Sequence, residues 1–249
     1  MLVEPQRTNI FPQDLSGAGV VTRTITVANA TVYSVSVEGT GSMALSGAGT
    51  GTVSEGSPVT FTSSSTSLTL TLTGSLDYCQ VEVGAYPTSI IFTELVQETR
   101  NADVIQKTGI SSLLGDSAGT LFIEASFFEQ GLIGVSDGTT NNRYSIGRAG
   151  SGRFLVFKGG VSQADINGGA TNLNTYYKLA ARMAINNAAL YINGASIGTD
   201  TSVEAIPDGT LNIVQFNAGG PNPFYGRIRT LAVYDYALDN TELANITTP

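Results

Sequence analysis

The sequence contains no histidine and no tryptophan, and only one of its 249 residues is cysteine. The lack of histidine removes the most common general base, the Ser–His and Cys–His nucleophile pairs and the most common metal ligand. The single cysteine, Cys79, excludes an internal disulfide. It lies in an alternating, strand-like run without a neighbouring cation, which predicts a small and unreactive core residue. Such a chain is expected to bind or to build rather than to catalyse.

Charge is also scarce in this chain. Charged residues make up 13% of the sequence, about half the usual share for a soluble domain, and the net charge is −8. No dense group of lysines and arginines is present, which argues against nucleic acid and anionic membranes as partners. No run of about 18 apolar residues occurs, so no membrane insertion is expected. The first residues lack the basic and apolar regions of a signal peptide.

Short segments in which apolar residues alternate with Ser and Thr fill most of the chain. This period of two is typical of strands with one buried and one wet face. Residues 17–84 hold a first set, and the stretch Ser46–Gly51 between them is interpreted as a long loop. A second set occupies residues 119–249, where Asn193 and Gly194 form the strongest two-residue hairpin signal. The clearest segments are Thr22–Val27, Thr31–Val37, Pro58–Ser63, Leu68–Thr73, Asp77–Val83, Thr120–Phe128, Gly131–Val135, Asn142–Gly147, Phe154–Phe157, Tyr176–Met183, Ala188–Ile192, Leu211–Phe216 and Phe224–Tyr236.

The predicted fold class is all-β, with two antiparallel β-sandwich or jelly-roll domains and a short C-terminal helix. Asp239 can cap this helix, and Glu242 three residues later completes a capping-box pattern. Residues 1–16 are expected to form an ordered N-terminal strap. Residues 85–118 have no clean period and are expected to connect the small β-sandwich domain, 17–84, to the second domain, 119–249.

Eight segments, taken in order, carry a likeness to a known family: LVEPQRTN from Leu2, YPTSII from Tyr86, TRNAD from Thr99, GTLFIEAS from Gly119, IGVSDGTTNNR from Ile133, YKLAAR from Tyr177, ALYING from Ala189 and GRIRTLAVY from Gly226. They resemble tailed-phage virion proteins that carry a concanavalin A-like (laminin G-like) jelly-roll domain. The resemblance spans nearly the whole chain. It implies that residues 119–249 form such a jelly roll, that the protein is located in the virion, and that its partners are other virion proteins.

The resemblance implies a non-enzymatic surface protein of the phage particle. This would be a capsid fibre or decoration, or a tail adhesin, that attaches to the host surface or its glycans. Two alternatives remain open: a glycan-degrading depolymerase of the concanavalin-like glycosidase type, and a purely structural tail or baseplate subunit. The fold of this family hosts lectins, glycosidases and structural modules, so the fold alone does not decide between them.

The acids available to a glycosidase are Glu124 and Glu129, because concanavalin-like glycosidases of the laminarinase type carry a Glu-x-Asp-x-x-Glu strand. Ser126 stands here at the position of the central Asp. A retaining pair needs carboxyl groups about 5–5.5 Å apart. Without a bulge, a spacing of five residues places the two Glu side chains on opposite faces of the strand. Since no tryptophan is available to line a glycan cleft either, we predict no hydrolase activity.

Glycan sites combine an aromatic ring with groups that hydrogen-bond to sugar hydroxyls. The candidate ligand-binding residues are Asn217, Asn222, Tyr225 and Tyr177.

A calcium ion at a loop rim is a further implication of the resemblance. Asp137, Asn141 and Asn142 offer the oxygen ligands that this hard cation prefers. The same residues are also ordinary turn formers, so a turn without a metal is the alternative interpretation. No other cofactor is expected.

The predicted connector carries several apolar side chains that belong to neither strand pattern, next to a charged residue. Two isolated domains would have to bury these side chains internally, whereas copies of the chain could bury them against one another. Sandwich edges also need a cover. We therefore predict a homotrimer with this connector near its axis. The predicted assembly residues are Ile90, Ile91, Phe92, Leu95 and Arg100.

Overall fold

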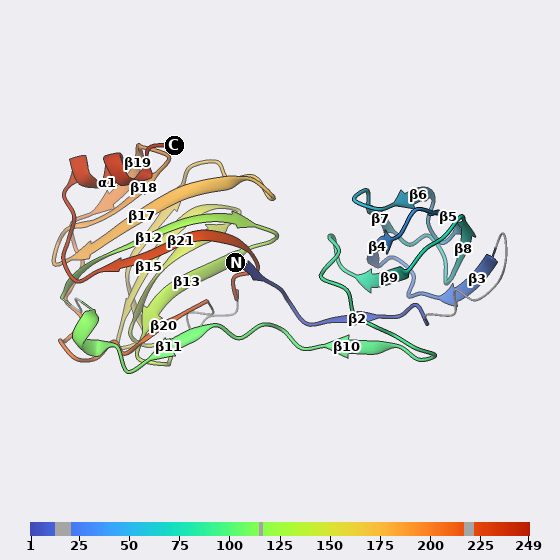
Figure 1. Ribbon diagram of the computed structural model, residues 1–249. Coiled ribbons are helices and arrows are strands. Elements are labelled where there is room, and N and C mark those ends of the chain that lie inside the picture. Colours follow the sequence, from blue (N-terminus) through green and yellow to red (C-terminus); the bar gives the residue numbers. More distant parts are fainter. Residues whose placement is uncertain (13–20, 115–116, 217–221) are drawn as a thin grey trace. The chain divides into compact units, whose positions relative to one another are not determined.

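The computed structural model describes residues 1–12, 21–114, 117–216 and 222–249, and it divides the chain into two compact units (Figure 1). The larger unit contains residues 1–4 and 104–249, and the smaller unit contains residues 5–103. The predicted connector is thus shared, with residues 85–103 in the smaller unit and 104–118 in the larger one. The predicted N-terminal strap also contributes to both units, because Val3 is buried in the core of the larger unit and Phe11 in the core of the smaller unit.

The larger unit is a sandwich of two six-stranded sheets whose strand ladders are antiparallel. The first sheet has the order β1 (Leu2–Val3), β21 (Gly226–Tyr234), β12 (Ala118–Phe127), β17 (Tyr176–Ala184), β18 (Ala188–Ile192) and β19 (Ala195–Asp200). The second has the order β11 (Gln106–Thr108), β20 (Ile213–Gln215), β13 (Gly131–Ser136), β14 (Arg143–Ala149), β15 (Ser151–Lys158) and β16 (Val161–Gly168). A 3-10 turn, η1, spans Ser111–Leu113.

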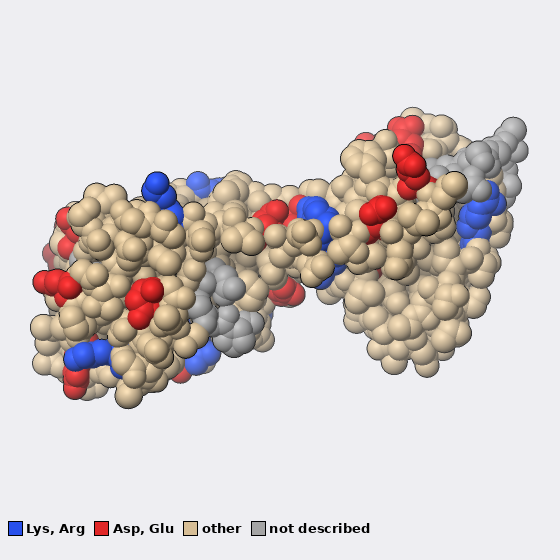
Figure 2. All heavy atoms as spheres, turned by 90° about the horizontal axis from the view of Figure 1, so that it is seen from below, with Lys and Arg blue, Asp and Glu red and all other residues tan. Residues whose placement is uncertain are grey.

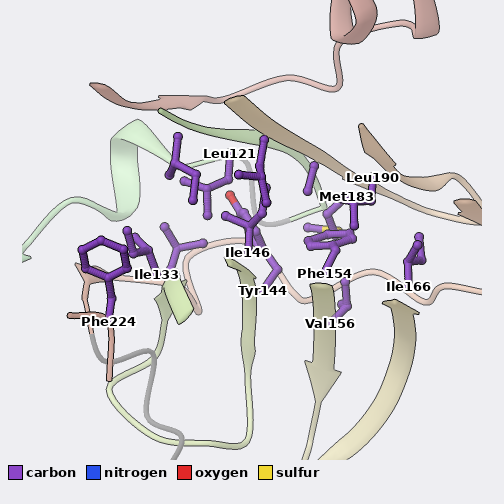
Figure 3. Packing of buried hydrophobic residues seen from close by; sticks show 14 of the residues in the cluster. Leu121, Ile133, Tyr144, Ile146, Phe154, Val156, Ile166, Met183, Leu190 and Phe224 are labelled. Carbon is purple, nitrogen blue, oxygen red and sulfur yellow. The ribbon is translucent and has the colours of Figure 1, made fainter. Parts of the chain in front are cut away.

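The core of this unit lies between the two sheets, as strand periodicity requires. In β12, Leu121 and Ile123 point inward, and in β14, Tyr144 and Ile146 do so. Figure 3 shows Leu121, Tyr144 and Ile146 packed with partners such as Phe154. The predicted all-β fold class, with antiparallel sheets and a short C-terminal helix, is confirmed.

The C-terminal helix α1 (Asn240–Thr247) packs on the outer face of the first sheet, where Leu243 joins Phe122 and Ala180 in a second apolar cluster. The predicted capping box is present. The Asp239 carboxylate accepts a hydrogen bond from the Glu242 backbone N–H at 2.8 Å, and the Glu242 carboxylate accepts one from the Asp239 N–H at 2.7 Å. No helix among the described residues is long and apolar enough to cross a membrane.

The smaller unit also consists of two antiparallel sheets. One has the order β10 (Glu98–Arg100), β2 (Arg7–Asn9), β9 (Tyr78–Val83), β4 (Val32–Glu38) and β7 (Val59–Thr62). The other has the order β3 (Val21–Thr26), β8 (Ser67–Thr73), β5 (Ser42–Gly47) and β6 (Gly51–Ser54). Alternate residues such as Val35, Leu70 and Val81 form the core between them.

Several strands differ from the prediction. The segment interpreted as a long loop, Ser46–Gly51, contains the end of β5 and the start of β6, which pair with each other, and only residues 48–50 connect the two strands. Strand β16 was not predicted, and β19 was implied only by the hairpin signal at Asn193–Gly194. Both lie at sheet edges. Strand β19 has no buried residue and β16 buries only Ala164 and Ile166, so the alternation from which a strand is recognised is absent in one and short in the other. The predicted hairpin at Asn193–Gly194 is present, with φ values of 48° and 83° that suit a two-residue turn.

Candidate functional site

A hollow of about 310 Å³ lies on the outer face of the first sheet of the larger unit. Three neighbouring strands, β17, β12 and β21, provide most of it (Figure 1). Its lining combines aromatic, charged and amide groups: Glu124, Tyr176, Tyr177, Lys178, Asn193, Arg229 and Pro249. Its lining is about half polar and half apolar and it is open to solvent, which suits a ligand that combines hydroxyl groups with C–H faces.

Strand alternation and one bulge bring these side chains together. Tyr176 and Lys178 share the outer face of β17 with Ala180, which packs in the cluster under α1. On β21, Thr230 pairs with Glu124, and Ile228 pairs with Ala125, the next residue of β12. Arg229 therefore has no pairing residue on β12 and forms a β-bulge. Such a bulge re-aims side chains locally.

Arg229 is held by two neighbours. Its Nη1 lies 3.0 Å from Glu124 Oε1, and its guanidinium carbon lies 3.8 Å from the centre of the Tyr176 ring. The hydrogen bond with Glu124 raises the pKa of the Arg229 guanidinium above its ordinary value. A guanidinium has five N–H donors, so the pairing with Glu124 leaves donors for a ligand. The arrangement therefore presents an oriented cation beside an aromatic ring.

The remaining polar groups of the hollow are fixed by backbone contacts. Asn193 Oδ1 accepts a hydrogen bond from the Lys178 N–H at 2.9 Å, and Lys178 Nζ donates one to the Thr248 carbonyl at 2.8 Å. Sequence reasoning did not single out Lys178, Asn193 or Arg229 as ligand residues. The period-two rule could have placed Lys178 beside Tyr176, but the bulge that re-aims Arg229 has no signature in the sequence.

The hollow contains one carboxylate side chain among its described lining residues. That carboxylate, on Glu124, forms an ion pair with Arg229. The second acid of the predicted glycosidase pattern, Glu129, follows the end of β12, and Ser126 is buried with no hydrogen-bond partner for its hydroxyl among the described residues. The paired acids that glycoside hydrolysis requires do not meet in this hollow.

Of the predicted ligand-binding residues that the structure describes, only Tyr177 lines the hollow. It packs against the sandwich core, however, and its hydroxyl accepts the Asn172 N–H at 2.9 Å. Tyr225 also packs against the core. The Asn222 carbonyl accepts the Leu132 N–H at 3.1 Å. Asn217 lies outside the described residues. In β17, the outward-facing tyrosine is therefore Tyr176 rather than Tyr177.

The predicted calcium residues lie together in the loop between β13 and β14. One Asp137 oxygen accepts the Thr139 N–H at 2.7 Å and the Thr139 hydroxyl at 2.6 Å, and the other accepts Asn142 Nδ2 at 2.8 Å. Asn142 Oδ1 accepts a hydrogen bond from the Gly159 N–H, and the Asn141 backbone carbonyl accepts one from the Gly160 N–H.

These bonds change the electrostatics of the loop. Partial burial, the largest single effect, raises the pKa of the Asp137 carboxyl, but the hydrogen bonds from Thr139 and Asn142 outweigh it and the net shift is downward. No group of three or more Asp, Glu, Cys or His residues that could hold a metal ion occurs in the described part of the chain. The contacts describe a turn held by its own side chains, and calcium binding here stays a prediction.

The outer face of the second sheet carries a further polar strip. Ser136 Oγ accepts hydrogen bonds from Gln215 Nε2 at 3.0 Å and from the Gly138 N–H at 3.1 Å. Next to it, the Arg143 guanidinium stacks over Phe157 at 4.2 Å. The Ser145 hydroxyl is buried and has no hydrogen-bond partner among the described residues. Ser136, Arg143 and Ser145 are all buried, so this strip is not an open polar surface for a ligand.

The predicted assembly residues fall in the smaller unit and differ in exposure. Ile91 is buried within the unit and Ile90 is half-buried, whereas Phe92 and Leu95 are 64% and 79% exposed. Arg100 Nη2 donates to the Pro5 carbonyl at 3.2 Å. Together with Val96, 62% exposed, Phe92 and Leu95 form what we term the apolar segment.

Residues 118–244, about half of the chain, match the laminin G-type family model described as the concanavalin A-like lectin/glucanases superfamily. The chain belongs to this superfamily. A search of curated proteins found no match.

Among solved structures, the chain is similar to the CBM40 of the Ruminococcus gnavus IT-sialidase bound to α2,3-sialyllactose, with 19% identity and a TM-score of 0.48 over 58% of this chain and 98% of that one. It is similar to a heptameric SAP-like pentraxin from Limulus polyphemus, with 19% identity and a TM-score of 0.45 over 55% and 72%. Sheep galectin-11 in complex with glycerol matches with 10% identity and a TM-score of 0.36 over 54% and 99%.

Proposed function

We propose that this protein is a non-enzymatic, glycan-binding surface protein of a tailed-phage particle that attaches to the host surface. Membership of a superfamily of lectins and glucanases supports glycan binding. The segments that resemble phage virion proteins support the location in the particle. The partners would be other virion proteins on one side and a host-surface glycan on the other.

The observation that carries the proposal is the chemistry of the hollow. Tyr176 supplies an aromatic ring, Arg229 and Lys178 supply cationic donors, and Asn193 supplies an amide. Sugars are recognised by such mixtures, because their C–H faces pack on rings while their hydroxyls take hydrogen bonds from planar polar groups. Since Glu124 and Tyr176 already orient Arg229, little ordering entropy has to be lost on binding.

A binding role is favoured over hydrolysis because the only carboxylate side chain of the described lining, Glu124, forms an ion pair with Arg229. A retaining or inverting glycosidase needs two acids across the scissile bond. We therefore expect no release of reducing ends from bacterial surface polysaccharides. Release that disappears in Glu124→Gln would show that the depolymerase alternative is correct.

Binding is tested by presenting purified bacterial surface polysaccharides and a glycan array to the full chain. We expect Tyr176→Ala and Arg229→Ala to weaken binding by about tenfold or more, the effect of removing a central aromatic or cationic contact. Tyr236→Ala and Arg153→Ala are matched controls, since Tyr236 is exposed elsewhere and Arg153 pairs with Asp165 on another sheet. Equal losses in all four variants would refute a site in the hollow.

A structural role in the particle is the second candidate function, and the apolar segment favours it. Phe92, Leu95 and Val96 present apolar surface close together on one short stretch, and such surface on a protein commonly marks an interface. The proposed arrangement is the homotrimer, with this segment between the copies. Electron microscopy of intact particles labelled with an antibody against this protein distinguishes the two roles. The antibody should bind at the surface or at a tail tip of the particle if the protein is an adhesin, and should not bind if the protein is an internal tail or baseplate subunit.

A further inference from the structure

The smaller unit contains a cavity of about 240 Å³ on the outer face of its five-stranded sheet. Its floor is formed by β4 and β9. One wall is the turn between β6 and β7, and the other is the segment 87–90, which crosses the sheet face. This volume lies below the ~300–1,000 Å³ typical of pockets for drug-sized ligands, so it suits a single side chain or a group of that size.

The cavity is built by buried hydrogen bonds rather than by a loose loop. The Glu82 carboxyl group is fully buried, and it accepts the Thr88 N–H at 2.9 Å and the Thr88 hydroxyl at 2.5 Å. The Gln80 amide, 2% exposed, accepts the Ile91 N–H at 2.6 Å and donates to the Thr88 carbonyl at 3.2 Å. These hydrogen bonds hold the segment 87–90 against β9 and so define one side of the cavity.

The interior and the rim of the cavity differ in character. Tyr78, Pro87 and Ile90 line it with apolar surface, and the Gln80 amide in its floor is already satisfied within the unit. At the rim stand Glu38 and Glu55, both exposed. Neither carboxylate has an ion-pair or hydrogen-bond partner among the described residues, and the described lining contains no lysine or arginine.

The smaller unit as a whole is acidic, which also favours a positively charged partner. Residues 5–103 contain three arginines and no lysine against eight acidic residues. On the face shown in Figure 2, charged side chains are few and scattered. The cavity in contrast has two carboxylates, those of Glu38 and Glu55, in its lining.

We propose that this cavity binds the basic side chain, lysine or arginine, of a partner protein. The match follows from the shape of these side chains, which bury an aliphatic stem and keep a charged head at the surface. The stem would lie against Tyr78, Pro87 and Ile90, and the head would reach Glu38 and Glu55. The ring of Tyr78 adds an attraction for a cation. The proposal does not depend on glycan binding, because it concerns the other unit of the chain.

The test uses the full chain and three short peptides, acetyl-Gly-Lys-Gly-amide, acetyl-Gly-Arg-Gly-amide and the same peptide with the uncharged isostere norleucine. Binding is followed by NMR shifts of backbone amides, with Gly56 and Ser89 as reporters beside the cavity. We expect saturable shifts with the lysine and arginine peptides and none with norleucine. Glu38→Gln and Glu55→Gln are each expected to weaken binding by about three- to tenfold, as one partly exposed charge contact allows.

Glu98→Gln is the matched control, because Glu98 is an exposed acid of the same unit outside this cavity. It should bind the basic peptides as the unchanged chain does. Three outcomes would overturn the proposal: no shifts at Gly56 and Ser89 with any peptide, equal binding of the norleucine peptide, or equal weakening by Glu98→Gln. Each variant replaces an exposed side chain, so a folded protein is expected in every case.

Discussion

At the scale of single residues, Cys79 shows how packing controls reactivity. Its side chain is fully buried in the core of the smaller unit, and its Sγ lies 3.3 Å from Met43 Sδ. Burial raises the pKa of the Cys79 thiol far above its ordinary value, so the reactive thiolate does not form near neutral pH. We expect iodoacetamide to leave the native chain unmodified and to label one site after unfolding, as measured by intact mass. Rapid labelling of the folded protein would contradict this.

Asp137 makes a second prediction at this scale, concerning pH. The pKa of its carboxyl is lower in the folded chain than the usual 3.8, so it contributes stability above that value, and this contribution is lost as the pH falls through the folded pKa. We expect Asp137→Asn to lower the unfolding free energy near neutral pH by about 1 kcal/mol, a discounted value for a largely exposed group. The difference from the unchanged chain should vanish in acid.

The pH dependence is checked by thermal unfolding of both proteins near neutral pH and well below the usual carboxyl pKa. Titration with Ca²⁺ in the same experiment tests the calcium prediction, because a bound ion raises the melting temperature of the unchanged chain and not of the variant. A deficit of Asp137→Asn that stays constant from neutral to acid pH would show that the carboxylate charge does not matter.

At the scale of elements, the segment after β9 is held by a buried carboxyl group. Glu82 accepts three hydrogen bonds, from the Gln80 amide and from the Thr88 backbone and hydroxyl. Replacing it by glutamine would turn an N–H₂ group toward donors. We expect Glu82→Gln to cost about 2–3 kcal/mol in the smaller unit. Hydrogen exchange of residues 85–93 is the measurement: protection should fall there first, and Glu98→Gln should leave it unchanged.

Element prediction from the sequence succeeded where a strand buries one face. Strand β8 buries every second residue, and the helix after Asp239 carries its own capping signal. It failed at edges such as β11, which lies in the predicted connector, has no buried residue and pairs with β20 through backbone hydrogen bonds. Backbone pairing of this kind depends on which strands lie adjacent, and local sequence does not contain that information.

At the scale of the whole molecule, the apolar segment makes a prediction about assembly. Phe92, Leu95 and Val96 are exposed in the single chain, and covering them between copies removes apolar surface from water. We expect light scattering to give about three times the 25.9 kDa mass of one chain at micromolar concentration, and Leu95→Asp to give monomers. Val161→Asp, at an equally exposed valine in β16, is the control. A stable monomer of the unchanged chain would contradict the trimer.

The sequence by itself determined the class of the fold and the absence of a histidine-based site. Period-two alternation is local, since each residue's side depends only on its neighbours, and composition needs no structure to be read.

Only the tertiary structure decided which side chains converge. Arg229 reaches Glu124 because β21 gains one residue against β12, and Lys178 lies beside Tyr176 on the outer face whereas Tyr177 turns toward the core. In the smaller unit, the cavity at Glu38 and Glu55 exists because Gln80 and Glu82 hold a distant segment over the sheet. Such contacts join residues far apart in the chain. Register and bulges set them, and neither property is encoded in the local pattern of apolar and polar residues.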